Sequence, residues 1–400
     1  MHLTNYTKKA GLYLITFMLA IASCSKNTGN DNEQDPPPPP PPPQGQQDIA
    51  TVDNAVKAFM DKYNVPGLSL AVTKNEKLVY VKAYGKADKE AGTNLTPQHK
   101  FRIASVSKPV TAVAVMKLIE EGKLSLNDKV FGDGALLGTT YGTKAYSTNL
   151  KNITVKHLLT HTAGAWGNSS NDPMFFNAAW NFTQLINYTL DNLPVQRTPG
   201  TFYDYSNFGY CLLGRIIEKV SGKSYAEYVK LAVLTPAGIT GMELGGSKLS
   251  DRKQNEVKYY GTQTGGPDPY AYNIERMDAH GGWIATPSEM VKFMCAVDGY
   301  GNIKDILTGT SIQTMTSVPS ATAGSNYALG WGVSGNSWWH MGSLPGLVTE
   351  IARNGSNGVN AFVAVNIRDG GQFANDLDVM LWNAIVRNNN IKWQNIDQFK

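Results

Sequence analysis

Ser105 and Lys108 stand three residues apart at the start of an apolar run, and this pair of side chains could do chemistry. Pro109 is tolerated only in the first turn of a helix, so it predicts that a helix begins at Ser105. Residues three apart share one helix face, which places the hydroxyl beside the amine. Residues 110–119 are almost wholly apolar and should be buried. A lysine at the mouth of a buried helix is costly unless it is paired or partly neutral.

A neutral amine beside a hydroxyl is the arrangement that activates a serine nucleophile. The spacing alone is weak evidence, because Ser250 and Lys253 repeat it within a polar, loop-like stretch. The alternative for Ser105 and Lys108 is a helix-capping serine followed by a lysine that extends to solvent. The helical context favours Ser105 as the nucleophile.

Such a nucleophile also needs a second proton carrier and hydrogen-bond donors for the developing oxyanion. Tyr205 and Asn207 stand just before another apolar helix-like run, and His340 and Gly342 lie in the alternating stretch SWWHMG. Two further segments repeat these patterns but sit in a glycine-rich turn or before a helix, and neither is selected; they are Tyr300-Gly301-Asn302 and His280-Gly281-Gly282.

The elements that must position these side chains follow from periodicity. Apolar residues at helical spacing predict a helix near residues 49–65, and alternation predicts two strands in 67–85. Residues 105–300 are mainly helical in pattern, the tail from 328 to 368 returns to strands, and a helix closes the chain around Leu377–Val386. Strands at both ends of the chain predict one antiparallel sheet completed by distant segments.

Four segments, in this order along the chain, resemble signatures of the serine β-lactamase and penicillin-binding protein superfamily, in particular its class C-like branch; they are Ser105 to Lys108, Ile153–Gly164, Tyr205-Ser206-Asn207 and His340-Met341-Gly342. The resemblance covers about residues 50–390. It implies an α+β fold of the β-lactamase/transpeptidase type, in which an antiparallel sheet flanked by helices is joined by an all-α subdomain. The active site is then expected between these two parts.

The resemblance also implies residue roles. Ser105 would form an acyl-enzyme, Lys108 and Tyr205 would share the proton transfers, and Asn207 would position Lys108 and the substrate amide. The strand with His340 and Gly342 would orient the substrate, and the N–H of Ser343 would face the N–H of Ser105 as an oxyanion hole. We expect no metal and no organic cofactor.

The substrate stays open among esters, D-amino-acid peptides and β-lactams. His340 replaces the lysine whose charge meets the substrate carboxylate in β-lactamases, so we expect a poor β-lactamase that prefers esters or peptides. Activity on carboxylated substrates should then rise as the pH falls toward 6. An α/β-hydrolase would need a GxSxG sequence, and none occurs in this chain. An inactive binding protein or sensor of cell-wall fragments would be expected to lose Ser105, Lys108 or Tyr205.

The N-terminal segment indicates export. Residues 1–23 carry two lysines and then an apolar run too short to span a bilayer, which is typical of a signal peptide. They end before Cys24 in a sequence that resembles a bacterial lipobox, the alternative being an ordinary signal peptide with a chance cysteine. Residues 24–47 would be a lipid-anchored, polar and proline-rich tether, and 48–400 one hydrolase domain with a helical insert at about 110–300. We therefore expect a lipoprotein of the bacterial cell envelope, on the periplasmic face or the cell surface.

Composition limits the partners. The chain has 400 residues and a net charge of +4, which falls to +2 when the signal peptide removes two lysines and no acidic residue. No long basic cluster stands out, so we expect no nucleic acid. Cys211 and Cys295 lie in apolar stretches and should be core residues rather than a zinc site, although a disulfide between them is the alternative. The expected partners are a small-molecule or peptide substrate, which could derive from peptidoglycan, and a membrane bound through the lipid; the chain should be a monomer.

Overall fold

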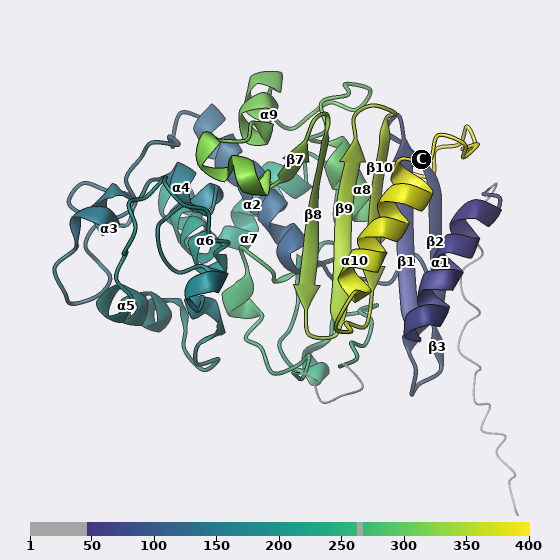
Figure 1. The fold of residues 1–400 in the computed structure, drawn as a ribbon, viewed down its shortest axis with the longest axis horizontal. Coiled ribbons are helices and arrows are strands. Elements are labelled where there is room, and N and C mark those ends of the chain that lie inside the picture. Colours follow the sequence, from purple (N-terminus) through teal and green to yellow (C-terminus); the bar gives the residue numbers. More distant parts are fainter. Residues whose placement is uncertain (1–45, 262–266) are drawn as a thin grey trace, which may run out of the picture. The chain divides into compact units, whose positions relative to one another are not determined.

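A seven-stranded antiparallel sheet dominates the computed structural model, which describes residues 46–261 and 267–400. The predicted signal peptide, Cys24 and nearly all of the tether lie outside the described residues. Figure 1 shows the sheet, whose strand order is β3-β2-β1-β10-β9-β8-β7. Its strands are β1 (Gly67–Lys74), β2 (Lys77–Asp88), β3 (Thr93–Asn94), β7 (Gly332–Ser334), β8 (Ser337–Leu344), β9 (Leu347–Asn354) and β10 (Val359–Val365).

The two ends of the chain meet in this sheet. Strand β1 pairs antiparallel with β10, so that Leu68 lies opposite Val365, although almost the whole domain separates them in sequence. Both strands are buried along nearly their full length because helices cover both faces. The predicted antiparallel sheet completed by distant segments is therefore confirmed.

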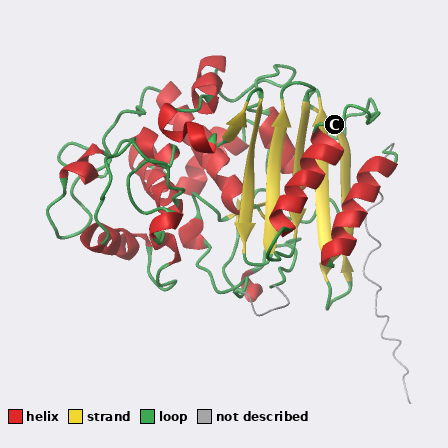
Figure 2. Ribbon diagram, viewed as in Figure 1, coloured by secondary structure: helices red, strands yellow, loops and turns green. Residues whose placement is uncertain are grey.

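Helices cover each face of the sheet. On one face lie α1 (Ala50–Tyr63) and α10 (Phe373–Val379), the latter continuing as a π-helical stretch over Met380–Val386. Figure 2 shows these helices in front of the strands. On the other face, α8 (Pro287–Cys295) packs against β1 and β10. The sheet is therefore the middle layer between helices.

The remaining helices form the all-α part beyond the β7 edge of the sheet (Figure 1). They are α2 (Ser107–Glu120), α3 (Thr148–Asn152), α4 (Val155–Leu159), α5 (Phe182–Asn192), α6 (Asn207–Ser221), α7 (Tyr225–Val229), which continues as a π-helical stretch over Lys230–Leu234, and α9 (Gly309–Thr316). Short 3₁₀ turns cover Ala104–Val106, Asn168–Ser170, Pro173–Phe175, Leu249–Asp251, Glu275–Met277 and Ser320–Ser325.

Two expected boundaries differ in the structure. The helix predicted to begin at Ser105 begins at Ser107, and Ser105 lies in the preceding 3₁₀ turn. The region expected to be a helical insert also supplies two strands, β5 (Glu243–Leu244) and β6 (Trp283–Ala285), to a second small sheet. This sheet has the order β4-β6-β5, and β4 (Phe101–Arg102) precedes the insert. Strands of two or three residues leave too little alternation for periodicity to detect.

The two cysteines of the domain match the prediction. Cys211 and Cys295 are buried free thiols, as predicted for core residues. Within residues 46–261 and 267–400, none of the helices combines the length and apolar character needed to cross a bilayer.

Candidate active site

Ser105 projects from a strained turn at the entrance to α2. The residue before it, Ala104, has φ of 46°, a left-handed conformation that costs an L-residue about 1–2 kcal/mol. The turn leaves Ser105 partly exposed, whereas Lys108 one turn later is 0% exposed. Backbone strain of this kind is held in place only where the surroundings fix it, as they often do at functional sites.

Lys108 donates to three neutral oxygens. Its Nζ lies 3.0 Å from Ser105 Oγ, 2.8 Å from Asn207 Oδ1 and 3.3 Å from the carbonyl oxygen of His280. Burial lowers the pKa of Lys108 well below its usual value, and the charge of Asp172 opposes this only in part. The lysine is therefore suited to be a neutral amine at a pH where an exposed lysine would be charged.

Tyr205 packs its ring against the same amine. Lys108 Nζ lies 4.6 Å from the centre of the Tyr205 ring. Burial raises the pKa of Tyr205 well above its usual value, while a hydrogen bond with the Ser105 side chain opposes the rise. The phenol thus stays protonated beside the hydroxyl it touches, and the structure brings Ser105, Lys108 and Tyr205 into one cluster.

Helix α6 delivers Asn207 to this cluster from its first residue. Ser206 caps the helix, since its Oγ accepts the N–H of Gly209 at 3.0 Å and donates to the carbonyl of Trp166 at 2.7 Å. The amide oxygen of Asn207 then points at Lys108. The backbone N–H of Asn207 is held by the buried carboxylate of Asp172, a residue that the sequence patterns did not single out.

His340 lies on β8 and is held as a neutral imidazole. Its Nδ1 lies 2.7 Å from the carbonyl oxygen of Met341 and therefore carries the proton, so Nε2 accepts from the Tyr327 hydroxyl at 3.1 Å. Burial and the nearby charge of Lys108 lower the pKa of His340 to about 3. This neutral state argues against the expectation that protonation of His340 raises activity on carboxylated substrates toward pH 6, a prediction that the pH dependence of the rate tests.

Gly342 lets β8 approach the Ser105 turn. A Cβ atom at this position would lie 2.3 Å from the carbonyl oxygen of Ile103 and 2.4 Å from Thr349 Oγ1. Thr349 itself donates to the Ile103 carbonyl at 2.9 Å, which ties β9 to the same segment. Ser343 follows as an exposed residue on β8. The predicted oxyanion role of its N–H remains a prediction, and the close approach is compatible with it.

The edge of β8 that faces β7 lacks a strand partner along more than half its length. Strand β7 pairs only with Ser337, Trp338 and Trp339. In the part of the chain that the structure describes, residues 340–344 thus have β9 as their only strand neighbour. An unpaired strand edge beside a nucleophile can bind an extended substrate through backbone hydrogen bonds.

Two histidines at the site were missed or set aside by the sequence patterns. His161 is buried, accepts the N–H of Ser206 on Nδ1 at 3.0 Å, and stacks 4.3 Å from the Tyr205 ring. His280, in the rejected His-Gly-Gly segment, contributes its backbone carbonyl to Lys108. A backbone contact leaves no mark on side-chain type, which is why the sequence could not reveal it. Tyr300, in the other rejected segment, instead donates to the carbonyl of Asn354.

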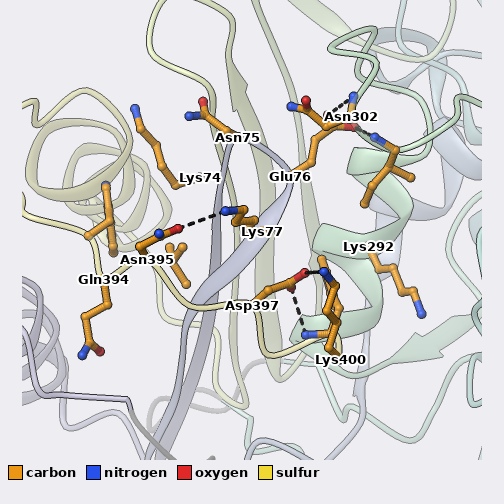
Figure 3. A pocket seen from close by; sticks show the side chains of 14 residues that line it. Lys74, Asn75, Glu76, Lys77, Lys292, Asn302, Gln394, Asn395, Asp397 and Lys400 are labelled. Carbon is orange, nitrogen blue, oxygen red and sulfur yellow. Dashed lines mark hydrogen bonds and ion pairs between the residues drawn. The ribbon is translucent and has the colours of Figure 1, made fainter.

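One well-formed pocket lies away from Ser105 and its neighbours. It has a volume of about 660 Å³ and lies where the β1–β2 hairpin meets the C-terminal residues 393–400. Figure 3 shows that polar pairs line it, such as Lys77 with Asn395 and Asp397 with Lys400. Across residues 46–261 and 267–400, we find no group of three or more His, Cys, Asp or Glu side chains placed to hold a metal ion.

The cluster of Ser105, Lys108 and Tyr205 can perform acyl transfer. It combines a partly exposed hydroxyl, a buried amine whose pKa is lowered, and a phenol whose pKa is raised. Titratable neighbours whose pKa values are pushed apart are suited to act as base and acid at the same pH. All seven residues predicted for the hydrolytic site lie on the elements that meet here; Cys24 lies outside the described residues.

Comparisons with known proteins agree with this geometry. A family model described as "Beta-lactamase" matches residues 52–381. Protein flp of Staphylococcus aureus (strain N315) is 25% identical over 323 residues, which are 79% of this chain and 62% of that protein. The chain therefore spans less than two thirds of the length of this relative.

Solved structures are similar as well. The octameric penicillin-binding protein homologue from Pyrococcus abyssi superposes with a TM-score of 0.68 and 26% identity, covering 84% of this chain and 78% of that one. The D-amino acid amidase from Ochrobactrum anthropi SV3 gives a TM-score of 0.67 at 24% identity, covering 84% of this chain and 98% of the amidase. At that identity the amidase supports the fold alone, and the predicted β-lactamase/transpeptidase-like α+β fold is confirmed.

Proposed function

Because this chain belongs to the beta-lactamase family, within its class C-like branch of serine hydrolases and penicillin-binding proteins, we propose that it hydrolyses its substrate through an acyl-enzyme on Ser105. One observation carries the proposal. The Nζ of fully buried Lys108 lies 3.0 Å from Ser105 Oγ, and its other two polar neighbours are the neutral oxygens of Asn207 and of the His280 carbonyl. A lysine in such surroundings can be neutral and accept the proton of the attacking hydroxyl.

The reaction follows from these contacts. Ser105 Oγ attacks the substrate carbonyl carbon while its proton passes to neutral Lys108, and the carbonyl π electrons move onto oxygen. Donors beside β8 stabilise that oxyanion. When it collapses, the bond to the leaving group breaks, and Tyr205 or protonated Lys108 supplies the proton that the leaving group needs. Water then attacks the acyl carbon and gives a proton to the same basic group. The bond between the acyl carbon and Ser105 Oγ breaks, and that proton passes to Ser105 Oγ, which restores the enzyme.

The substrate class that fits best is an ester or a D-amino-acid peptide or amide. Efficient β-lactam hydrolysis fits less well, because a neutral His340 offers no charge-assisted contact to a β-lactam carboxylate. The similarity of fold to a D-amino acid amidase supports amides as a test substrate. A peptide derived from peptidoglycan would belong to this class.

We also propose that the protein works at the bacterial cell envelope as a lipid-anchored monomer without bound nucleic acid. The support is in the sequence: a signal peptide over residues 1–23, a lipobox-like Cys24 and a tether up to residue 47. A run of eight prolines would hold the domain away from the lipid as a stiff spacer.

The test is intact-mass detection of acyl adducts across three substrate types, namely an activated ester, a D-phenylalanine amide and a penicillin. The wild-type protein should gain the acyl mass with at least one of them, and Ser105→Ala should gain none. Ser250→Ala is the matched control, because it removes the serine of the other Ser-x-x-Lys sequence and should keep the adduct. An adduct that survives Ser105→Ala would refute the nucleophile. Specific ligand binding without any adduct or turnover would instead favour an inactive binding protein.

A further inference from the structure

A buried carboxylate stands behind the lysine at the start of α6. Asp172 is 2% exposed, and its Oδ2 accepts the N–H of Asn207 at 2.5 Å. Its Oδ1 accepts the N–H groups of Phe208 at 3.2 Å and Met174 at 3.0 Å. The first N–H groups of a helix lack partners within the helix and carry partial positive charge, so a carboxylate satisfies them well. Asp172 thereby fixes the residue whose side chain holds Lys108.

Arg276 pins the loop that carries Asp172. The guanidinium is 4% exposed and donates, at 2.7 to 2.9 Å, to four backbone carbonyls of one segment, those of Met174, Phe176, Asn177 and Trp180. Asn273 adds a bond to the carbonyl of Ala178 at 2.9 Å. The planar fork of arginine can bind several oxygens at once, which a lysine cannot reproduce. The loop is thus held as a unit against α6.

The charges around Asp172 come from two helices and the segment before α6. Lys108 on α2 interacts with this carboxylate when it is protonated, and Tyr205 and Cys211 are titratable groups near enough to sense the charge of Asp172. Burial raises the pKa of Asp172 to about 6, which its backbone hydrogen bonds and Lys108 oppose. Most of the carboxyl is therefore ionised at pH 7.5, and its charge works against the burial that lowers the pKa of Lys108.

We propose that Asp172 is a positioning residue for the acylation step: held by the Arg276 clamp, its carboxylate fixes Asn207 at the start of α6 and sets how readily Lys108 gives up its proton. This inference rests on the proposed function, because Lys108 must act there as the base. Asp172 acts through Asn207 and through its field, and it exchanges no proton with the substrate.

Loss of the Asp172 charge should change how the acylation rate depends on pH. Acylation needs neutral Lys108, so the rate rises as pH rises through the pKa of that lysine. Removing the negative charge of Asp172 removes an influence that raises this pKa, and the acid limb of the profile should move to lower pH. Asn207 loses its anchor at the same time, so the plateau of the rate should fall.

The experiment measures single-turnover acylation by an activated ester from pH 5 to 9 in the wild type and Asp172→Asn. We expect the acid limb to move down by about one pH unit, the low end of the range for loss of a neighbouring opposite charge. We expect the plateau to fall about tenfold or more, because misplaced catalytic groups commonly cost up to about 10²-fold. KM should change little, because Asp172 does not contact the substrate.

Asp204→Asn is the matched control. Asp204 stands one residue before Tyr205 and accepts from the backbone and hydroxyl of Ser169, at 3.1 and 2.6 Å. It takes the same substitution and should keep the wild-type acid limb. An equal shift in both variants would contradict the proposal, because any nearby charge would then suffice.

Loss of folding must be distinguished from loss of the positioning role of Asp172. Circular dichroism and melting temperature report whether Asp172→Asn folds, and Arg276→Lys serves if it does not. Arg276→Lys keeps the positive charge but cannot bind the four carbonyl oxygens at once. It should therefore lower the plateau of the acylation rate, as Asp172→Asn does. If the wild type never acylates Ser105, the proposed function itself fails. If the wild type does acylate Ser105, and a folded Asp172→Asn variant keeps the wild-type acid limb and rate plateau, the positioning role of Asp172 is refuted while the proposed function stands.

Discussion

Ser105 and its neighbours divide the acid and base roles through burial. Desolvation disfavours the charged form of any group, so it lowers the pKa of Lys108 and raises that of Tyr205. The same surroundings therefore make one residue a proton acceptor and the other a proton donor near neutral pH. No separate charge is needed to set the two pKa values apart. The negative charge of Asp172 only opposes part of the lowering of the Lys108 pKa.

The neutral state of His340 gives a prediction about carboxylated substrates. We expect the ratio of kcat/KM for a substrate with a free carboxylate to that for its methyl ester to stay constant from pH 8 to 6. Since the pKa of His340 is lowered to about 3, no charge appears on it in this range. Steady-state rates on the matched pair of substrates measure this ratio. The titration of Lys108 affects both substrates equally and therefore cancels in the ratio. A rise of about tenfold by pH 6 would mean that His340 becomes protonated there.

At the scale of elements, the site depends on the close approach of β8 to the turn before α2. The backbone contact at Gly342 leaves no room for a side chain, since a Cβ would lie 2.3 Å from the Ile103 carbonyl oxygen. An added methyl must therefore push the strand and the turn apart. The donors expected on β8 would move with the strand.

Gly342→Ala should consequently reduce acylation by about 10² or more, the usual range for loss of an oxyanion donor. Stopped-flow acylation with an activated ester measures this, and the melting temperature reports any loss of stability. Gly309→Ala is the control, since its Cβ would meet nothing within 4 Å and its φ is not positive. If a folded Gly342→Ala keeps the wild-type acylation rate, the strand does not contribute in this way.

The sequence predicted those elements that carry a strong local signal. Pro109 and the apolar run revealed α2, but the strained turn shifted its start from Ser105 to Ser107, because φ at Ala104 leaves no trace in residue type. Alternation revealed β8 with His340. The Asp172 loop could not be predicted, because its role comes from backbone N–H groups of a helix that lies 35 residues further on. Contacts to backbone atoms across such distances follow from the tertiary fold.

At the scale of the whole molecule, the tether and the domain should be separable. Cys24→Ser should release the protein from the membrane fraction while leaving hydrolysis by the purified protein unchanged. The substitution would remove the lipidated residue and with it the anchor. Hydrolysis should be unchanged because the hydrolase domain begins only after the spacer. Fractionation of the native host, followed by an activity assay on each fraction, tests this. A variant that stays with the membrane would show that something other than the lipid anchors it.

The central claim is that buried Lys108 acts as the base for Ser105. The most direct measurement is the rate of Ser105 acylation against pH in the wild type and Lys108→Ala, with and without added propylamine. The wild type should show an acid limb with an apparent pKa well below 10.4, the usual lysine value. Lys108→Ala should lose that limb and at least about 10² in rate, part of which the amine restores. Near-normal acylation by a folded Lys108→Ala variant would contradict the account.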